Sequence, residues 1–580
     1  MPPLLKHLIE CGLLTAQQAA VVMRRQQRTN QPTEQVLQAL KFCPQERLFR
    51  CLAEFYAVPY CDLSTPPEPS AAAELLPARL ATQFHCVPVS NADGTLQLAF
   101  SRLPDSTVIN QLRLLGIHFE VALATPEAVD NRLSVIYGPG AGNALQLQQR
   151  RMERFGLPAA PEASSAAVAA AEVQGEDESS DAASVPALVN SIIADAISRG
   201  ATDLHIEPFE KQLNIRLRID GMLRTVATPP EMRPLLEPIT ARLKVMAALN
   251  IAEKRLPQDG RLQFSHNGRI WNLRLSVLPS RYGETVCLRI LPAARNAVEL
   301  SGLGLNPRHL ALLKELAGRT HGLVLVTGPT GSGKTTTLYS VLSHLRLHHP
   351  ELKIITVEDP VEYDMPGITQ LQTHAEIGLT FSVLLRSILR HDPDVLLIGE
   401  IRDRETAEIA IQSAITGHLV FSTLHTNDSI GAVNRLVNMG TEPDLVASSL
   451  NGVVAQRLVR RLCPHCAVPA DAAAVPPGLY EELRACARAA GLEQLQLRRP
   501  ADGGCSQCGG SGYHGRIAIY EFFEIDDQTE DRIAAGTADS QLRRLARDRG
   551  MATFRDDGLL KAAQGLTSID EVLRVTAGKH

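Results

Sequence analysis

The stretch LVLVTGPTGSGKTT, residues 323–336, decides the fold of the larger half of this chain. It runs from an apolar strand through a glycine-rich loop into a helix start, which is the context that the pattern GxxxxGK[ST] requires. The glycines allow backbone N–H groups to point inward at a phosphate. Lys334 can then reach the β- and γ-phosphates, and the Thr335 hydroxyl can hold magnesium. The stretch predicts a nucleoside triphosphate site formed by Gly328, Pro329, Thr330, Gly331, Ser332, Gly333, Lys334, Thr335 and Thr336.

Two later apolar strands end in acidic residues. Residues 354–357 lead to Glu358, and residues 395–398 lead to Gly399 and Glu400. Strands that alternate with helices in this way predict a parallel α/β sheet, in which ligands gather at the carboxyl ends of the strands. We therefore expect both glutamates to face the phosphates.

The residue before Glu400 departs from the usual pattern. Gly399 stands where a Walker B strand ordinarily places Asp, so Glu400 is left to hold magnesium through water or to polarise the nucleophile. A fourth strand follows, with His418 before it and His425 after it. His425 would share the carboxyl edge with the two glutamates and is a candidate for contact with the γ-phosphate. A satisfied surface or core histidine is the alternative interpretation.

Composition limits the class of protein. A chain of 580 residues predicts several domains, and 44% hydrophobic with 21% charged residues is an ordinary globular mixture. The formal charge of −5 and the aromatic content of 4% argue against a nucleic-acid translocase, which needs a basic pore loop or an aromatic stacking platform. No apolar run approaches the roughly 18 residues of a membrane span. The N-terminus is typical of an amphipathic helix rather than a signal peptide.

Periodicity and composition indicate how the chain is divided. The first 63 residues contain a weak repeat offset by 28, which predicts paired helical hairpins, and residues 84–100 predict a β-hairpin. Thr125 is placed to cap a helix. We expect an N-terminal module of mainly helical or α+β character (1–140), a mildly acidic flexible linker (141–184), a second α+β domain (185–295) and the P-loop domain (296–580). A marginal Ala-rich helix is the alternative to the flexible linker.

The cysteines predict a metal site. Without an export signal, the eleven cysteines are expected to be thiols or metal ligands in a reducing cytosol. Two CxxC pairs can supply the four ligands of a closed tetrahedral zinc site within a subdomain at 455–520, although a redox role is the rival interpretation. The expected ligands are Cys463, Cys466, Cys505 and Cys508. The remaining seven show no such pairing and are expected to be buried small residues: Cys11, Cys43, Cys51, Cys61, Cys86, Cys287 and Cys486.

Together these segments resemble the ATPases of type II secretion and type IV pilus assembly. The resemblance covers about residues 185–580, and the later stretches favour the type II (GspE-type) members. It rests on the glycine loop (328–339), the aspartate box ITVEDPVEY (355–363), the atypical Walker B segment LRHDPDVLLIGEIRD (389–403), the histidine box TGHLVFSTLHTN (416–427), and the upstream stretches ATDLHIEP (201–208) and KRLPQDGR (254–261).

The resemblance implies a hexameric ring of RecA-like motor domains, with ATP, Mg²⁺ and a structural Zn²⁺. It implies that ATP lies between the second α+β domain and the motor domain, and that Arg274 and Arg289 reach the phosphates from the smaller domain, as arginine fingers do. It also favours Glu358 as the general base. Arg457 and Arg460 are expected on one face of a helix, where one of them could approach the nucleotide and an ordinary surface face is the alternative.

The N-terminal module is similar to the family domain that binds cyclic di-GMP in some members. That pattern begins Arg-Leu-Gly, whereas this chain has Pro3-Leu4-Leu5, so we expect no cyclic di-GMP binding. The module is expected instead to dock the protein onto an inner-membrane platform protein, which would allow an acidic phospholipid surface as a further partner. The expected function is that of an ATP-driven motor for type II secretion; a pilus assembly ATPase, a nucleic-acid translocase and a nucleotide-gated adaptor are the alternatives.

Overall fold

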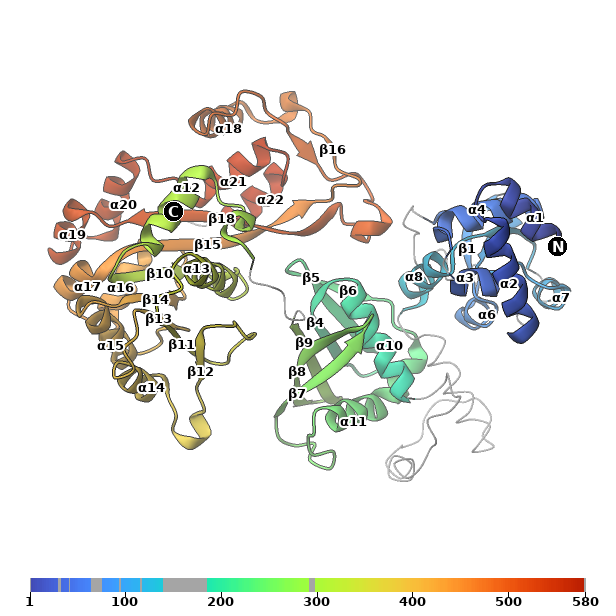
Figure 1. Ribbon diagram of the computed structural model, residues 1–580, viewed down its shortest axis with the longest axis horizontal. Helices are drawn as coiled ribbons and strands as arrows, with labels where there is room; N and C mark the ends of the chain where they lie inside the picture. Colours follow the sequence, from blue (N-terminus) through green and yellow to red (C-terminus); the bar gives the residue numbers. More distant parts are fainter. Residues whose placement is uncertain are drawn as a thin grey trace. The chain divides into compact units, whose positions relative to one another are not determined.

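The computed structural model describes residues 2–29, 33–40, 42–63, 76–92, 95–114, 117–138, 185–291 and 298–577. Packing divides the chain into two compact units, Met1–Leu291 and Pro292–His580, whose elements are labelled in Figure 1. The expected linker at 141–184 lies outside the described residues.

Two helical hairpins open the first unit, as the 28-residue repeat predicts. Leu5 and Leu8 of the first helix and Leu48 and Leu52 of the fourth are buried in one core. The four helices are α1 (Pro3–Glu10), α2 (Ala16–Thr29), α3 (Thr33–Leu40) and α4 (Gln45–Tyr56).

A small three-stranded sheet follows the hairpins. Strand β1 pairs antiparallel with β2, which confirms the expected β-hairpin, and β3 pairs parallel with β2. The Thr125 hydroxyl accepts a hydrogen bond from the Ala128 amide at 3.3 Å, which confirms the expected helix cap. The elements are α6 (Ala78–Phe84), β1 (Cys86–Ala92), β2 (Thr95–Phe100), α7 (Ser106–Leu114), β3 (Phe119–Leu123) and α8 (Pro126–Tyr137).

Residues 185–291 form a six-stranded antiparallel sheet in the order β6-β5-β4-β9-β8-β7. Alternate residues such as Leu273 and Leu275 are buried with the apolar residues of α10 and α11, so the intervening residues, Arg274 among them, point to the opposite face. The elements are α10 (Val185–Ser198), β4 (Ala201–Pro208), β5 (Leu213–Ile219), β6 (Met222–Val226), η1 (Pro230–Leu235), α11 (Leu236–Met246), β7 (Gln258–His266), β8 (Arg269–Ser280) and β9 (Gly283–Leu291).

A seven-stranded sheet in the order β12-β11-β13-β14-β10-β15-β18 is the centre of the second unit. The first six strands are parallel and β18 pairs antiparallel with β15, so the expected parallel α/β sheet is confirmed with one antiparallel edge. Its strands are β10 (Gly322–Thr327), β11 (Ile354–Glu358), β12 (Thr369–Gln372), β13 (Val395–Ile398), β14 (Leu419–Leu424), β15 (Leu450–Leu462) and β18 (Tyr513–Glu524).

Helices cover both faces of this sheet, which explains why its strands are apolar throughout. Leu323 and Leu325 of β10 pack with α14, α15, α16 and α17, whereas Val324 and Val326 pack with α12 and α13. The helices are η2 (Leu300–Leu303), α12 (Pro307–Ala317), α13 (Lys334–His348), η3 (Ala375–Ile377), α14 (Phe381–Ile388), α15 (Arg404–Ile415), α16 (Gly431–Asn438) and α17 (Pro443–Ser449).

The C-terminal segments complete the second unit. They are β16 (Val468–Pro469), η4 (Ala472–Ala474), α18 (Pro477–Ala489), β17 (Arg498–Arg499), η5 (Ser506–Cys508), α19 (Asp527–Ala534), α20 (Asp539–Asp548), α21 (Phe554–Ala563) and α22 (Ile569–Thr576). Among the described helices, none combines the length and the apolar character needed to cross a membrane.

The expectation that Arg457 and Arg460 lie on a helix is wrong, because both lie on strand β15. The pairing of β15 with β18 along most of its length overrides the helical spacing of the two arginines. Arg457 donates to the Val575 carbonyl at 2.7 Å, and Arg460 pairs with Glu571 at 2.7 Å. Both guanidinium groups therefore hold α22 onto the sheet.

A buried ion pair fixes α21 against β18. Lys561 Nζ lies 2.6 Å from an Asp557 carboxylate oxygen, and the same oxygen accepts the Tyr520 amide at 2.9 Å. Removing one partner from a buried pair leaves an uncompensated charge, which typically costs about 3 kcal/mol or more. We expect Asp557→Ala to lower hydrogen-exchange protection of β18 and α21 by a factor of ~100 or more. The exposed control Asp548→Ala should leave it unchanged; equal protection in the two variants would show that the pair is dispensable.

Candidate functional site

The loop between β10 and α13 needs glycine at two positions because β15 approaches it closely. Gly328 and Gly333 have φ values of +146° and +91°. A Cβ atom on Gly328 would lie 2.3 Å from the Gln456 carbonyl oxygen, and one on Gly333 would lie 2.8 Å from Gln456 Nε2. Gln456 also accepts a hydrogen bond from Thr337 at 2.7 Å. Sequence reasoning missed Gln456, since its approach depends on the pairing of β10 with β15.

Lys334 begins α13 with its ammonium group turned into the loop. The residue is 9% exposed, and Nζ donates to the carbonyls of Gly328 at 2.7 Å and Pro329 at 3.3 Å. Burial lowers the pKa of Lys334 to about 8, although the nearby charge of Glu400 opposes that shift. Ser332 Oγ is buried without a hydrogen-bond partner among the described residues. A buried cation and an unpartnered hydroxyl in a glycine loop fit a phosphate group.

Glu400 and His425 lie beside Lys334 at the carboxyl edge of the sheet. His425 Nδ1 is 3.5 Å from Lys334 Nζ, and His425 Nε2 is 3.8 Å from a Glu400 carboxylate oxygen. Arg402 pairs with Glu400. Burial and the neighbouring Lys334 lower the pKa of His425, so its ring is neutral at pH 7. His418, at the other end of β14, instead contacts the Ser413 carbonyl.

Glu358 lies in a separate hydrogen-bonded group at the end of β11. Its carboxylate, 4% exposed as a residue, accepts hydrogen bonds from the Tyr339 hydroxyl, from Thr356 Oγ1 at 2.6 Å and from Gln370 Nε2 at 3.3 Å. Strand β11 is three strands from β10, or about 14 Å at ~4.8 Å per strand. The structure therefore brings Glu400, His425 and Lys334 together and places Glu358 farther along the same edge.

The absence of the usual Asp at position 399 has a steric reason. A Cβ atom on Gly399 would lie 3.2 Å from the Val357 carbonyl oxygen and 3.3 Å from the Glu358 Cα. The Gly399 amide also donates to that carbonyl at 2.8 Å. A side chain here would push apart β11 and β13, so the close approach of these strands favours glycine and leaves the carboxylate to Glu400.

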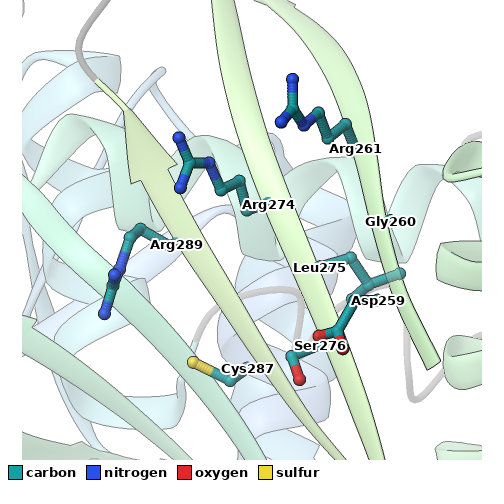
Figure 2. Close-up of a pocket in the computed structure, with 8 residues that line it drawn as sticks. All are labelled: Asp259, Gly260, Arg261, Arg274, Leu275, Ser276, Cys287 and Arg289. Carbon is teal, nitrogen blue, oxygen red and sulfur yellow. The ribbon is translucent and has the colours of Figure 1, made fainter. Parts of the chain in front are cut away.

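In the first unit, Arg274 and Arg289 belong to a row of three arginines. Arg261, Arg274 and Arg289 stand directly opposite one another on β7, β8 and β9, and Figure 2 shows them on neighbouring strands. They line a pocket of about 440 Å³ together with Asp259 and Cys287. Like charges placed opposite one another destabilise a sheet, so the row indicates an anionic ligand. Arg261 could not be identified as a site residue from the sequence, because strand register decides which residues stand opposite it.

One acidic residue ends this row. Asp203 on β4 accepts a hydrogen bond from Arg289 Nε at 3.1 Å and lies 3.7 Å from Arg218 Nε. Arg289 remains 56% exposed in its side chain, whereas the Asp203 side chain is 10% exposed. The carboxylate therefore fixes one edge of the arginine row while the guanidinium group of Arg289 still faces the pocket.

The four predicted zinc ligands converge. The sulfur atoms of Cys463 and Cys505 are 3.8 Å apart, and those of Cys466 and Cys508 are 3.9 Å apart. Four sulfurs at ~2.3 Å from a tetrahedral Zn²⁺ would be about 3.8 Å apart, so the spacing fits the ion. Burial raises the pKa of Cys508, but amide donors from Cys505 and Gly512 outweigh it and lower the pKa to about 7.

The chain matches the family model described as "Type II/IV secretion system protein" over residues 178–574. The chain belongs to this family. A second model, the MshEN domain, matches residues 56–143, so the Pro3-Leu4-Leu5 segment lies outside that match.

Named relatives come from both branches of the family. The chain is 48% identical to the type II secretion system protein HxcR of Pseudomonas aeruginosa, over 69% of this chain and 79% of that one. It is 41% identical to the type II secretion system ATPase E of Vibrio cholerae, over 86% and 96%. It is 38% identical to the type IV pilus assembly ATPase PilB of Myxococcus xanthus, over 98% of both chains.

The lowered pKa of Lys334 predicts a pH dependence of nucleotide binding. A phosphate favours the charged ammonium, so the protonated form binds, and above the free-protein pKa of about 8 binding must take up a proton. We expect the affinity for MgADP to fall about tenfold per pH unit from pH 8 towards pH 10, as measured by titration calorimetry. Lys334→Ala should show weak binding with no such slope. A wild-type affinity that stays constant from pH 7 to 9.5 would contradict this role of Lys334.

Proposed function

We propose that this protein is an ATP-hydrolysing, hexameric motor that powers type II protein secretion at the inner membrane. The main support is structural: Lys334, His425 and Glu400 lie close together beside a glycine loop at the carboxyl edge of a parallel sheet. Family membership and the names of the type II relatives support it. A P-loop site of this kind suits phosphoryl transfer from ATP to water.

Type IV pilus assembly is the second candidate function. The Myxococcus xanthus relative named as a pilus assembly ATPase aligns over 98% of both chains. The two candidates differ in the partner they would drive. Deletion of the gene should abolish export of folded proteins if the motor serves secretion, and surface pili if it serves pilus assembly; loss of neither would refute both.

In the proposed reaction, each residue of the site has a separate role. Thr335 and Glu400 would hold Mg²⁺, which supplies positive charge to the phosphate oxygens when bound. Lys334 stabilises charge on the β- and γ-phosphates, and His425 contacts the γ-phosphate. Glu358 accepts the proton of the attacking water; its support is a carboxylate held in place by Tyr339, Thr356 and Gln370 at the same sheet edge.

The arginine row is proposed to complete the site from the first unit. Arg274 and Arg289 are the two arginines that the family resemblance assigns to the phosphates, and the cross-strand register adds Arg261 to them. Planar guanidinium groups match phosphate oxygens well. Hexamer formation would give every P-loop an arginine row, whether from the same chain or from a neighbour.

Two further roles lie away from the nucleotide. Zn²⁺ bound by Cys463, Cys466, Cys505 and Cys508 is proposed to be structural, because four thiolates leave no open position for chemistry.

The N-terminal module is proposed to dock onto an inner-membrane platform protein near acidic phospholipid, not to bind cyclic di-GMP. Leu5, which stands at the place of the Gly in the Arg-Leu-Gly pattern, is a buried core residue of α1 and supports that choice. The proposed boundaries of the four parts remain 1–140, 141–184, 185–295 and 296–580.

The roles of the two glutamates can be separated by metal dependence. Glu358→Gln and Glu400→Gln should both keep ATP binding while hydrolysis falls about a hundredfold or more. The Mg²⁺ dependence of nucleotide binding should weaken in Glu400→Ala and survive in Glu358→Ala, as measured by fluorescent-nucleotide titration. Glu376→Gln, an exposed substitution in η3, is the control. The reverse metal pattern would exchange the two roles, and normal hydrolysis by Glu358→Gln would refute the base assignment.

The arginine row predicts loss of turnover without loss of binding. Arg261→Ala, Arg274→Ala and Arg289→Ala should each lower ATP hydrolysis by about 10³-fold, the contribution of an arginine finger. Removing Arg261 should not destabilise the sheet, because Arg261 stands opposite a like charge, Arg274. Arg269→Ala, at an exposed end of β8, is the matched control. Wild-type hydrolysis by Arg261→Ala would remove Arg261 from the site.

A further inference from the structure

A second group of metal-ligating side chains lies in the N-terminal hairpins, far in sequence from the four CxxC cysteines. His7 and Cys11 come from the end of α1, and Cys51 and Glu54 come from the last turns of α4. One donor atom from each residue lies within 4.8 Å of the other three. The expectation of burial is wrong for Cys11, which is exposed, and is confirmed for Cys51, which is buried; both residues join this cluster.

Helix geometry explains how the four side chains meet. His7 and Cys11 are four residues apart, and Cys51 and Glu54 are three apart, so each pair lies on one face of its helix. The two helices pack together through Leu5, Leu8, Leu48 and Leu52 in a shared core. The His7 ring also contacts the Phe55 ring at a centroid distance of 5.5 Å, which holds it over α4.

The spacing of the donor atoms suits a tetrahedral ion. Cys11 Sγ is 3.6 Å from His7 Nε2. A thiolate at ~2.3 Å and an imidazole nitrogen at ~2.05 Å from one tetrahedral Zn²⁺ would be about 3.6 Å apart. The agreement extends to the type of donor, since nitrogen, sulfur and one carboxylate oxygen are the atoms that Zn²⁺ takes in proteins.

The local electrostatics also favour a cation. Both contributing segments are helix C-terminal turns, where the carbonyl ends of the helix carry partial negative charge. Glu54 adds a full negative charge there, and each cysteine adds another when it binds a metal as thiolate. A divalent cation would offset this negative charge. Because it would bind side chains of both helices, it would also link α1 to α4.

We propose that His7, Cys11, Cys51 and Glu54 form a second Zn²⁺ site that fastens α1 to α4. The site is independent of ATP hydrolysis and of the four CxxC cysteines. It would stabilise the first helical hairpin against the second, because the metal is bound by the folded arrangement and not by the separated helices. Cys43 and Cys61, which lie in the same part of the chain, do not belong to the cluster.

The test is zinc stoichiometry of the full-length chain. Protein purified under reducing conditions and dialysed against a slight excess of Zn²⁺ should hold two equivalents by elemental analysis. Cys11→Ser and His7→Ala should each hold one, while Cys61→Ser, a half-buried cysteine outside the cluster, should hold two. Cys11 is exposed, so Cys11→Ser tests the site without disturbing the core, unlike Cys51→Ser.

A second readout identifies the ligands. Replacing zinc by Co²⁺ should give thiolate-to-cobalt absorption from two sites in the wild type, and the component lost in Cys11→Ser should have the lower intensity expected of two thiolates. Zn²⁺ should also increase hydrogen-exchange protection of α1 in the wild type and not in Cys11→Ser. An equal zinc count in wild type and Cys11→Ser, or a Cys11–Cys51 disulfide in the reduced preparation, would overturn the proposal.

Discussion

The buried ammonium group of Lys334 is the interaction on which the rest of the second unit depends. It is held by the carbonyls of Gly328 and Pro329, and it lies 3.5 Å from His425. A cation is tolerated here because the loop turns its polar atoms inward, which requires glycine where β15 approaches. The parallel order of β10, β14 and β13 then brings His425 and Glu400 to the same edge. The glycine loop, the order of the strands and the position of Glu400 therefore depend on one another.

Much of this arrangement could be predicted from the sequence because its signals are local. The strand before the loop, the glycines and the acids after β11 and β13 are each visible within a short window, and the two CxxC pairs are equally local. What the sequence did not show depends on pairing between distant segments. Gln456 meets the loop only through β15, Arg261 joins Arg274 only through strand register, and Cys11 meets Cys51 only when α1 packs on α4. Arg457 was misplaced for the same reason.

The two units contribute different kinds of electrostatic strain. In the second, a cation is buried with its pKa lowered; in the first, three arginines stand opposite one another across a sheet. Neither arrangement is expected of a protein selected for stability alone. In each unit, an anionic group would offset this positive charge. The two metal-ligating clusters differ from these sites in the sign of the charge that they favour. Each brings thiols together, and a cation would stabilise them as thiolates.

The most direct test of this account is a structure of the full chain with Mg²⁺ and a non-hydrolysable ATP analogue. In that structure, Lys334 Nζ should leave the Gly328 and Pro329 carbonyls for the β- and γ-phosphate oxygens. Thr335 and Glu400 should hold the Mg²⁺, and the guanidinium groups of an arginine row should lie within hydrogen-bond distance of the phosphates. A nucleotide bound elsewhere, with Lys334 still on the two carbonyls, would contradict the central claim that this loop is the phosphate site.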